Sequence, residues 1–248
     1  MKPLFVLFLG LALAGCAGSS PAPDADARAA VDPSTVGTVR GRVLLDGEAP
    51  PARAIRLDGD PKCVALAAGE ERRTEDIVTG DGNTLQHTFV YVKDGLPRAL
   101  YPVPSTPVVL DQQKCRYVPR VLGVQVGQPL TIRNSDALLH NVRAESAINE
   151  PFDVGTPVQG MEVTRTFATR EVMVPVKCNV HSWMTAYIGV LEHPFFSVSG
   201  ESGEFELRDL PPGTYTIEAW HERLGTQTQQ VTVAAGEARD LSFTYPAP

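Results

Sequence analysis

The chain places its strongest metal-binding side chains in one heptapeptide, Cys-Asn-Val-His-Ser-Trp-Met at residues 178–184. A cysteine thiolate, two neutral imidazole nitrogens and a long, weak thioether bond form the trigonal site that suits copper in electron transfer. Cys178, His181 and Met184 supply three of these four groups. The second imidazole must come from another part of the chain.

His140 is the candidate for the second imidazole, because it follows an alternating strand pattern at 130–133 and a polar turn. The order of one distant histidine, then Cys-x2-His-x2-Met between strands, resembles the type 1 copper proteins, the cupredoxins. The loop spacing is most similar to that of amicyanin. The resemblance covers roughly residues 85–192 and implies one mononuclear copper with four ligands: His140, Cys178, His181 and Met184.

The same resemblance implies roles for two neighbouring residues. Asn141 matches the asparagine that follows the first ligand histidine in plastocyanin-like proteins, where it ties that strand to the cysteine loop. In the resembled family the second ligand histidine, here His181, presents its outer edge at an apolar surface patch through which electrons pass. Trp183 would extend this patch, or would instead pack in the core.

Other interpretations of this residue set stay open. Cysteine, methionine and histidine often occur singly as buried core residues, which would make the set a matter of packing. Zinc is the alternative metal, although structural zinc sites use cysteine, histidine or carboxylate ligands and this set contains a thioether.

Residues 1–16 have the pattern of a targeting segment, with Lys2, an apolar run and small residues before Cys16. They resemble a bacterial lipoprotein signal, in which the cysteine becomes the lipidated N-terminus, and Ala17 resembles the outer-membrane sorting preference. The resemblance implies a protein of the bacterial cell envelope, lipid-anchored through Cys16 to the outer membrane and facing the periplasm. An ordinary secretory signal that is cut elsewhere is the alternative.

The remainder of the chain predicts an all-β protein behind a flexible tether at 17–36, which is poor in large apolar residues. One short helix is expected within 61–68. Residues 85–192 are expected to form a cupredoxin-like Greek-key β-sandwich. Its strands, and the two that precede it, are predicted at 38–45, 55–57, 88–93, 108–111, 121–126, 130–133, 163–167, 172–177 and 186–191.

Residues 193–248 predict a second, smaller β-sandwich with four further strands. The patterns Gly-x-Phe-x-Leu at 203–207 and Leu-Pro-Pro-Gly-x-Tyr at 210–215 resemble the carboxypeptidase regulatory-like domain. The opening pattern of that family lies at 39–43, far from the rest of the module. We therefore expect residues 37–84 to contribute strands that complete the C-terminal module around the inserted copper domain.

The four cysteines divide into two assigned residues and one pair. With Cys16 assigned to lipid and Cys178 to metal, Cys63 and Cys115 remain as a disulfide in an exported protein, where such bonds persist. The rival interpretation makes one of them a further metal ligand, with His87 as the nearest histidine.

Composition narrows the classes of function. A 248-residue chain with 43% hydrophobic and 21% charged residues is typical of soluble globular proteins. The net charge of −7 argues against nucleic-acid binding. No hydrolase triad order or phosphate-binding glycine loop is evident, so no enzyme is expected. The sequence predicts an electron carrier with a redox partner protein such as a c-type cytochrome. The alternatives are an adhesion or carbohydrate-binding lipoprotein without a functional metal, and a copper storage or delivery protein.

Overall fold

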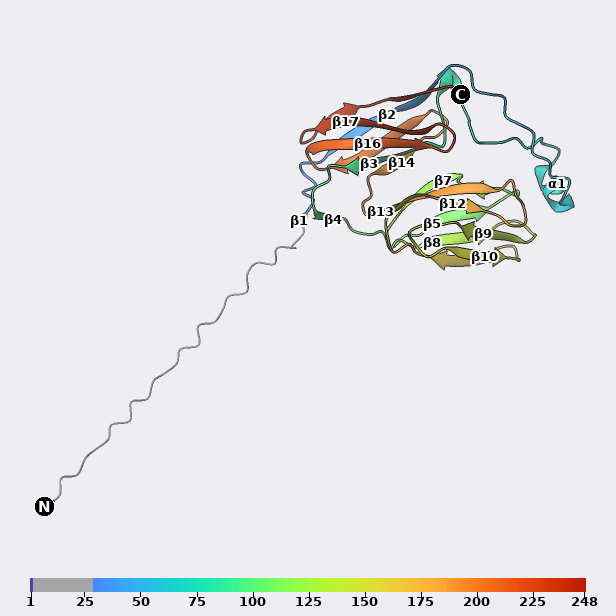
Figure 1. Ribbon diagram of the computed structural model, residues 1–248, viewed down its shortest axis with the longest axis horizontal. Coiled ribbons are helices and arrows are strands. Elements are labelled where there is room, and N and C mark those ends of the chain that lie inside the picture. Colours follow the sequence, from blue (N-terminus) through green and yellow to red (C-terminus); the bar gives the residue numbers. More distant parts are fainter. Residues whose placement is uncertain (2–28) are drawn as a thin grey trace.

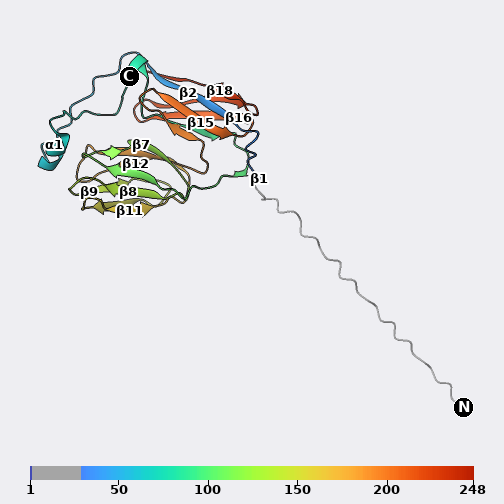
Figure 2. The same ribbon diagram turned by 180° about the vertical axis from the view of Figure 1, so that it is seen from behind.

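Two β-sandwiches lie side by side in the computed structural model, with one helix at the end of two long connections (Figure 1 and Figure 2). The structure describes residue 1 and residues 29–248. The signal segment, Cys16 and most of the tether lie outside the described residues. Within the described part of the chain, no helix is long and apolar enough to cross a membrane.

The middle of the chain forms the first unit, here called the central sandwich. Its core comes from alternating inward-facing residues, among them Leu110, Ile132, Val176 and Ile188, all fully buried. One sheet has the order β10-β9-β12-β13-β7 and the other the order β11-β8-β5-β6. The strands are β5 (Val108–Gln112), β6 (Tyr117–Val118), β7 (Val121–Gln125), β8 (Leu130–Asn134), β9 (His140–Ala144), β10 (Phe152–Thr156), β11 (Glu162–Arg165), β12 (Glu171–Lys177) and β13 (Thr185–Leu191).

Both ends of the described chain build the second unit, here called the terminal sandwich. Its sheets have the orders β14-β3-β16-β17 and β15-β2-β18, with β19 also paired to β2. The strands are β2 (Gly37–Asp46), β3 (Phe89–Asp94), β14 (Phe196–Val198), β15 (Glu204–Leu210), β16 (Gly213–His221), β17 (Gly225–Val233), β18 (Ala238–Asp240) and β19 (Phe243–Pro246). Because β2 pairs with β15, β18 and β19, the N-terminal strand completes the C-terminal module. A separate parallel pair joins β1 (Ala29–Ala30) to β4 (Ala99–Leu100).

The strand predicted at 88–93 belongs to the terminal sandwich, so residue 85 was the wrong place to begin the copper domain. Strand β3 pairs with β16 and β14. Its apolar side chains point alternately to the two faces of the strand, and each face packs in a different core. Val90 and Val92 pack in the core of the terminal sandwich, whereas Phe89 and Tyr91 pack in a cluster that includes Val121 of the central sandwich. When both faces of a strand are buried, both carry apolar residues, so the sequence pattern does not show to which sandwich the strand belongs.

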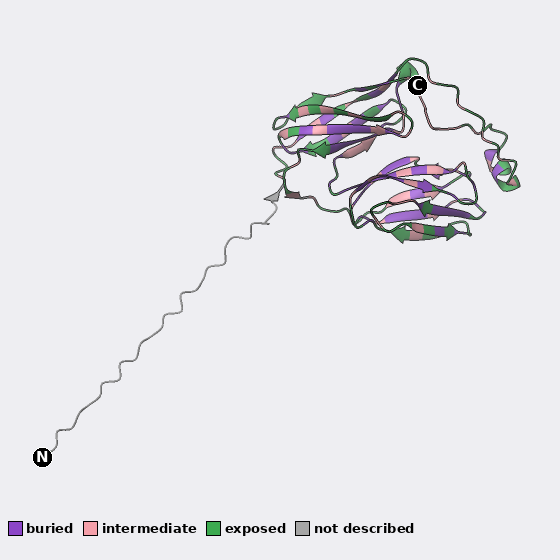
Figure 3. Ribbon diagram, in the orientation of Figure 1, coloured by how far each residue is buried: buried purple, intermediate pink, exposed green. Residues whose placement is uncertain are grey.

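Two glycines lie where the two sandwiches pack against each other. Gly123 of β7 and Gly189 of β13 are paired in register. A β-carbon at either position would lie 2.2–2.3 Å from the rings of Phe196 or Phe89, which project from the terminal sandwich. The two aromatic rings therefore occupy the space that side chains would fill. Figure 3 shows buried positions interspersed with intermediate and exposed ones along the strands of both sandwiches.

A long connecting segment, residues 47–88, leaves the terminal sandwich and returns to it (Figure 1). It contains the 3-10 helix η1 (Asp81–Asn83) and the one α-helix of the described chain, α1 (Pro61–Ala67), which lies inside the predicted range. The strand expected at 55–57 does not form, since this part makes only an isolated bridge between Ala54 and Arg73. The predicted all-β architecture of two sandwiches is confirmed.

Substitution of Gly189 by alanine should weaken the packing between the sandwiches, because the new β-carbon would lie 2.3 Å from the Phe89 ring. Overpacking of this kind costs about 1–3 kcal/mol. Chemical denaturation of the purified variant measures the loss. Gly155→Ala in β10 is the matched control, since a β-carbon there meets no atom within 4 Å. Equal losses in the two variants would contradict the role given to the glycine pair.

Candidate metal centre

Three buried side chains bring a sulfur and two nitrogens together at one end of the central sandwich. Cys178 and His181 lie in the loop from β12 to β13, and His140 begins β9. The Nδ1 atoms of the two histidines are 3.0 Å apart, and the sulfur of Cys178 lies 3.8 Å from Nδ1 of His181. The ligand-type atoms of all three residues lie within 4.8 Å of one another. None of the three side chains is more than 4% exposed.

The cysteine loop is a compact turn closed by its own backbone. The Cys178 N–H donates to the carbonyl oxygen of Met184 at 3.3 Å, and the Met184 N–H donates to that of His181 at 2.9 Å. The His181 N–H in turn points at the Cys178 sulfur, 3.4 Å away. Met184 is 1% exposed and packs in the same core cluster as Cys178. The structure thus gathers all four predicted ligand residues in one small region.

Asn141 links the histidine strand to the cysteine loop. Its Oδ1 accepts a hydrogen bond of 2.6 Å from the backbone N–H of Asn179, the residue after the cysteine. Its Nδ2 donates to Asp153, 2.6 Å away, and Asn179 donates to the other oxygen of that carboxylate. These bonds hold two segments 38 residues apart in one fixed position.

Each histidine ring turns its Nδ1 toward the cluster and its Nε2 toward a carboxylate. Nε2 of His140 lies 2.9 Å from Asp136, and Nε2 of His181 lies 3.1 Å from Asp60. A carboxylate accepts hydrogen bonds, so it places the imidazole proton on Nε2 and leaves a lone pair on Nδ1. With both rings neutral, the two Nδ1 lone pairs would face each other across 3.0 Å, an arrangement that a shared cation stabilises, whether a proton on one Nδ1 or a metal ion.

The electrostatics of the cluster favour a deprotonated cysteine. Burial acts to raise the pKa of Cys178, but hydrogen bonds from a protonated His140 ring and from the backbone of Asn141, His181 and Val180 outweigh it and lower this pKa to about 6. Burial likewise acts to lower the pKa of His140, but its hydrogen bonds with Asp136 and Cys178 outweigh burial and raise this pKa. For Asp136, burial is outweighed by hydrogen bonds from His140 and the Cys115 and Lys114 backbone, so its pKa falls below the usual value. A thiolate is the form of cysteine that binds metals.

Asp136 is itself held by a backbone nest. The successive N–H groups of Lys114 and Cys115 donate to its two oxygens at 2.7 and 2.8 Å. Both residues have positive φ, at 53° and 55°, although neither is glycine. Strained backbone of this kind persists where the surroundings enforce it and clusters at functional sites.

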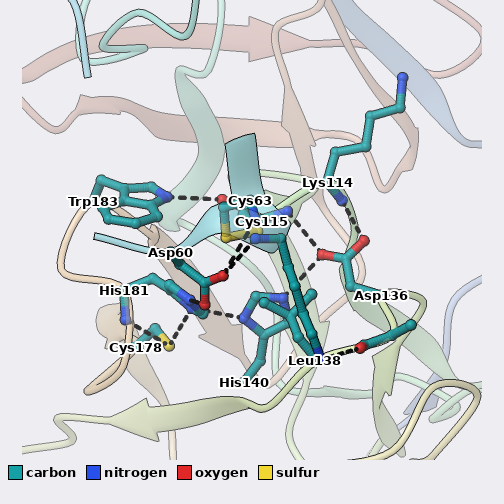
Figure 4. Close-up of a disulfide and its surroundings, with 12 residues drawn as sticks. Asp60, Cys63, Lys114, Cys115, Asp136, Leu138, His140, Cys178, His181 and Trp183 are labelled. Carbon is teal, nitrogen blue, oxygen red and sulfur yellow. Dashed lines mark hydrogen bonds and ion pairs between the residues drawn. A yellow bond between two sulfur atoms is a disulfide. The ribbon is translucent and has the colours of Figure 1, made fainter. Parts of the chain in front are cut away.

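The predicted disulfide between Cys63 and Cys115 is confirmed, and it lies beside the cluster (Figure 4). The Trp183 indole N–H donates to the carbonyl oxygen of Cys115 at 3.1 Å, and its ring centre is 5.1 Å from that of His181. Two further groups of possible ligands among the described residues each contain one of these half-cystines. A bridged sulfur has no thiolate to offer, and neither group includes His87, so the interpretation of Cys63 or Cys115 as a further ligand is wrong.

The expectation that His181 presents its outer edge at the surface is also wrong. The side chain is 2% exposed, and its Nε2 faces Asp60. Asp60 belongs to the part of the connecting segment that precedes the range of the resemblance, and this part covers the ring at one end of the central sandwich. Trp183 is half-buried between His181 and the disulfide, so it neither forms an open patch nor lies wholly in the core.

Two residues of the cluster, Asp60 and Asp136, were missed by the sequence interpretation. Asp136 precedes His140 by four positions, which offered a weak signal. Asp60 lies 121 positions from His181, and its place before Pro61 predicts only a helix cap. Only the folded chain brings it to the site.

The three donors fit a transition-metal ion. Imidazole nitrogens bind such ions at about 2.0–2.1 Å and thiolates at about 2.3 Å, so on one ion two nitrogens are at most about 4.2 Å apart, and a nitrogen and a sulfur at most about 4.4 Å apart. The observed separations of 3.0 and 3.8 Å lie within these limits. Both nearby carboxylates are engaged by Nε2 atoms and backbone N–H groups. The arrangement can therefore hold one ion with soft donors.

Comparison with a family model identifies part of the terminal sandwich. Residues 191–246, which span β14 to β19, match the carboxypeptidase regulatory-like domain. A search of curated proteins finds no match.

Several solved structures are similar to part of this chain. The Cu-containing nitrite reductase (NirK) from Thermus scotoductus SA-01 is 23% identical with a TM-score of 0.34, over 40% of this chain and 24% of that one. A single-residue mutant of amicyanin in its Cu(I) form is 22% identical with a TM-score of 0.31, over 41% and 97%. A purple cupredoxin from Nitrosopumilus maritimus is 22% identical with a TM-score of 0.27, over 30% and 80%. The chain thus spans about a quarter of the nitrite reductase.

Proposed function

We propose that this chain binds one copper ion through His140, Cys178, His181 and Met184, and that it carries single electrons. The observation behind this proposal is the convergence of two Nδ1 atoms and one buried cysteine sulfur, which all lie within 4.8 Å of one another. Copper held by such a donor set supplies a one-electron couple. The chain's own residues supply the thiolate and orient both imidazoles.

The donor chemistry favours copper over zinc. Structural zinc sites use cysteine, histidine or carboxylate ligands. Here a thioether residue, Met184, is buried in the same core cluster as Cys178, while Asp60 and Asp136 are turned to the outer sides of the histidine rings. Soft sulfur ligands together with imidazole are the combination expected for copper.

The rigid attachment of the cysteine loop to the sheet supports electron transfer rather than catalysis. The cysteine loop is fixed at both ends by strands of one sheet and near its start by Asn141, which bonds to Asn179. A centre held this firmly needs little rearrangement when its charge changes. If all four proposed ligands bound the copper, they would leave no vacant position of the kind that a catalytic metal keeps for its substrate. We propose a redox partner protein, such as a c-type cytochrome with a basic face, because this chain carries a net charge of −7.

Copper binding is tested first with the purified chain and copper(II). The wild type should bind one ion and become intensely coloured through thiolate-to-copper charge transfer, and Cys178→Ser should lose the colour while remaining folded. Met184→Leu should weaken copper binding. Met173→Leu is the matched control, since this methionine packs in the cluster between the sandwiches. A wild type that stays colourless after one equivalent of copper would refute the proposal.

Electron transfer is then separated from copper storage or delivery. Stopped-flow mixing of the reduced protein with an oxidised small cytochrome should show rapid electron exchange while copper stays bound. Copper should stay bound because the donor side chains are buried and hydrogen bonds hold the loop that carries them. Ready transfer of copper to a chelator in both oxidation states, together with slow electron exchange, would indicate delivery instead. A folded protein without copper affinity that bound glycans would favour the adhesion alternative.

We also propose that Cys16 carries lipid and anchors the chain to the outer membrane of a bacterial envelope, facing the periplasm. The support is the sequence pattern of residues 1–16. Cells given labelled fatty acid should label the wild type, whereas Cys16→Ala should remain unlabelled because no thiol is left to acylate. Recovery of an unlipidated wild-type protein that begins at residue 17 or later would contradict the anchor.

A further inference from the structure

The outer edge of His181 is covered by the connecting segment, which supplies none of the four proposed copper ligands. Asp60 reaches its Nε2 at 3.1 Å from the connecting segment, just before α1. We propose that Asp60 is a positioning residue that locks the His181 ring and closes the metal centre, and that the Cys63–Cys115 disulfide holds it in place. This inference rests on the proposed function and names residues that control the same site.

The Asp60 carboxylate is committed through both of its oxygens. Oδ1 accepts hydrogen bonds from the backbone of Lys62 at 2.8 Å and Cys63 at 3.4 Å, which caps α1. Oδ2 faces Nε2 of His181. The helix therefore aims the second oxygen at the ring, and the ring can donate to it only with its proton on Nε2. That tautomer leaves Nδ1 free for the metal.

The disulfide joins the two carboxylates into one assembly (Figure 4). Cys63 lies in α1, three residues after Asp60, and its backbone N–H is bonded to that carboxylate. Its partner Cys115 donates its own N–H to Asp136, which in turn holds His140. One covalent bridge thus links the group behind one histidine to the group behind the other.

Two further contacts hold the helix against the central sandwich. Lys62 donates through Nζ to the carbonyl oxygen of Ala137 at 3.2 Å, in the turn before His140. The half-cystines pack with Leu138 in a small buried cluster to which Leu66 of α1 also belongs. Since α1 has only seven residues, these contacts and the bridge are needed to keep it in place.

The contact predicts a specific effect on metal retention. Loss of the hydrogen-bonded partner behind a ligand histidine lowers metal affinity by about 10- to 100-fold. Asp60→Asn isolates this effect, because asparagine caps helices as well as aspartate does. Its amide oxygen would stay on the Lys62 and Cys63 N–H groups, which turns its NH2 group toward the Nε2–H of His181. Two donors would then face each other.

The experiment compares copper affinity in Asp60→Asn, Asp60→Ser and Asp58→Asn by competition with a chelator. The first two should lose about 10- to 100-fold, since serine also caps the helix but has no group that reaches His181. Asp58→Asn removes the same charge two residues away, where the side chain is exposed and pairs with Arg56, and should match the wild type. Equal affinities in all four proteins would overturn the positioning role.

A second readout uses the metal-free protein and does not depend on copper. NMR should show the Nε2–H of His181 exchanging slowly with solvent in the wild type and rapidly in Asp60→Asn. The double variant Cys63→Ala, Cys115→Ala should also exchange rapidly if the bridge holds Asp60 in place, and unchanged exchange would remove the disulfide from the inference. If the wild type shows slow exchange but never binds copper, the proposed function fails while the closure by Asp60 stands. Rapid exchange in a wild type that binds copper would refute the closure alone.

Discussion

Two imidazole rings that turn the same nitrogen toward one buried thiol are the constraint on which the rest of this structure depends. Left alone, their lone pairs would repel each other across 3.0 Å. The chain maintains the arrangement by supplying an acceptor behind each ring, Asp136 for His140 and Asp60 for His181. Without these acceptors, either ring could place its proton inward and satisfy itself without a cation.

The acceptors need support of their own, and the chain gives each a different kind. Asp136 accepts two adjacent N–H groups from a turn with positive φ, whereas Asp60 is held by a short capped helix and a disulfide. A bridge that closes a loop of about fifty residues stabilises the folded chain by about 4 kcal/mol. Here the bridge also sets the geometry on the outer side of the centre.

Negative charge collects around the proposed ion. The thiol of Cys178 and two carboxylates lie near the two imidazole rings, and both Asp60 and Asp136 have lowered pKa values because of the histidines and N–H groups beside them. In a buried site these charges are weakly screened and favour the more positive oxidation state of a bound metal. The same charges would resist release of a cation into water.

Much of the site could be predicted from local sequence, because ligand chemistry depends on residue type and short spacing. The grouping of Cys178, His181 and Met184 within one loop, and the alternation that predicts strands, are properties of neighbouring residues. The pairing of the two remaining cysteines followed from counting. The match of residues 191–246 to a known module was likewise visible in turn and strand motifs.

Other features depended on contacts between distant segments, which no local pattern encodes. Strand β3 looked like part of the copper domain because both of its faces are apolar, and only its pairing with β16 shows where it belongs. The burial of His181 was decided by the connecting segment, which brings Asp60 across 121 positions to the ring. Sequence alone determined which donors the candidate site offers. Tertiary structure decided what lies behind them, because a hydrogen-bond partner is chosen by proximity in the folded chain.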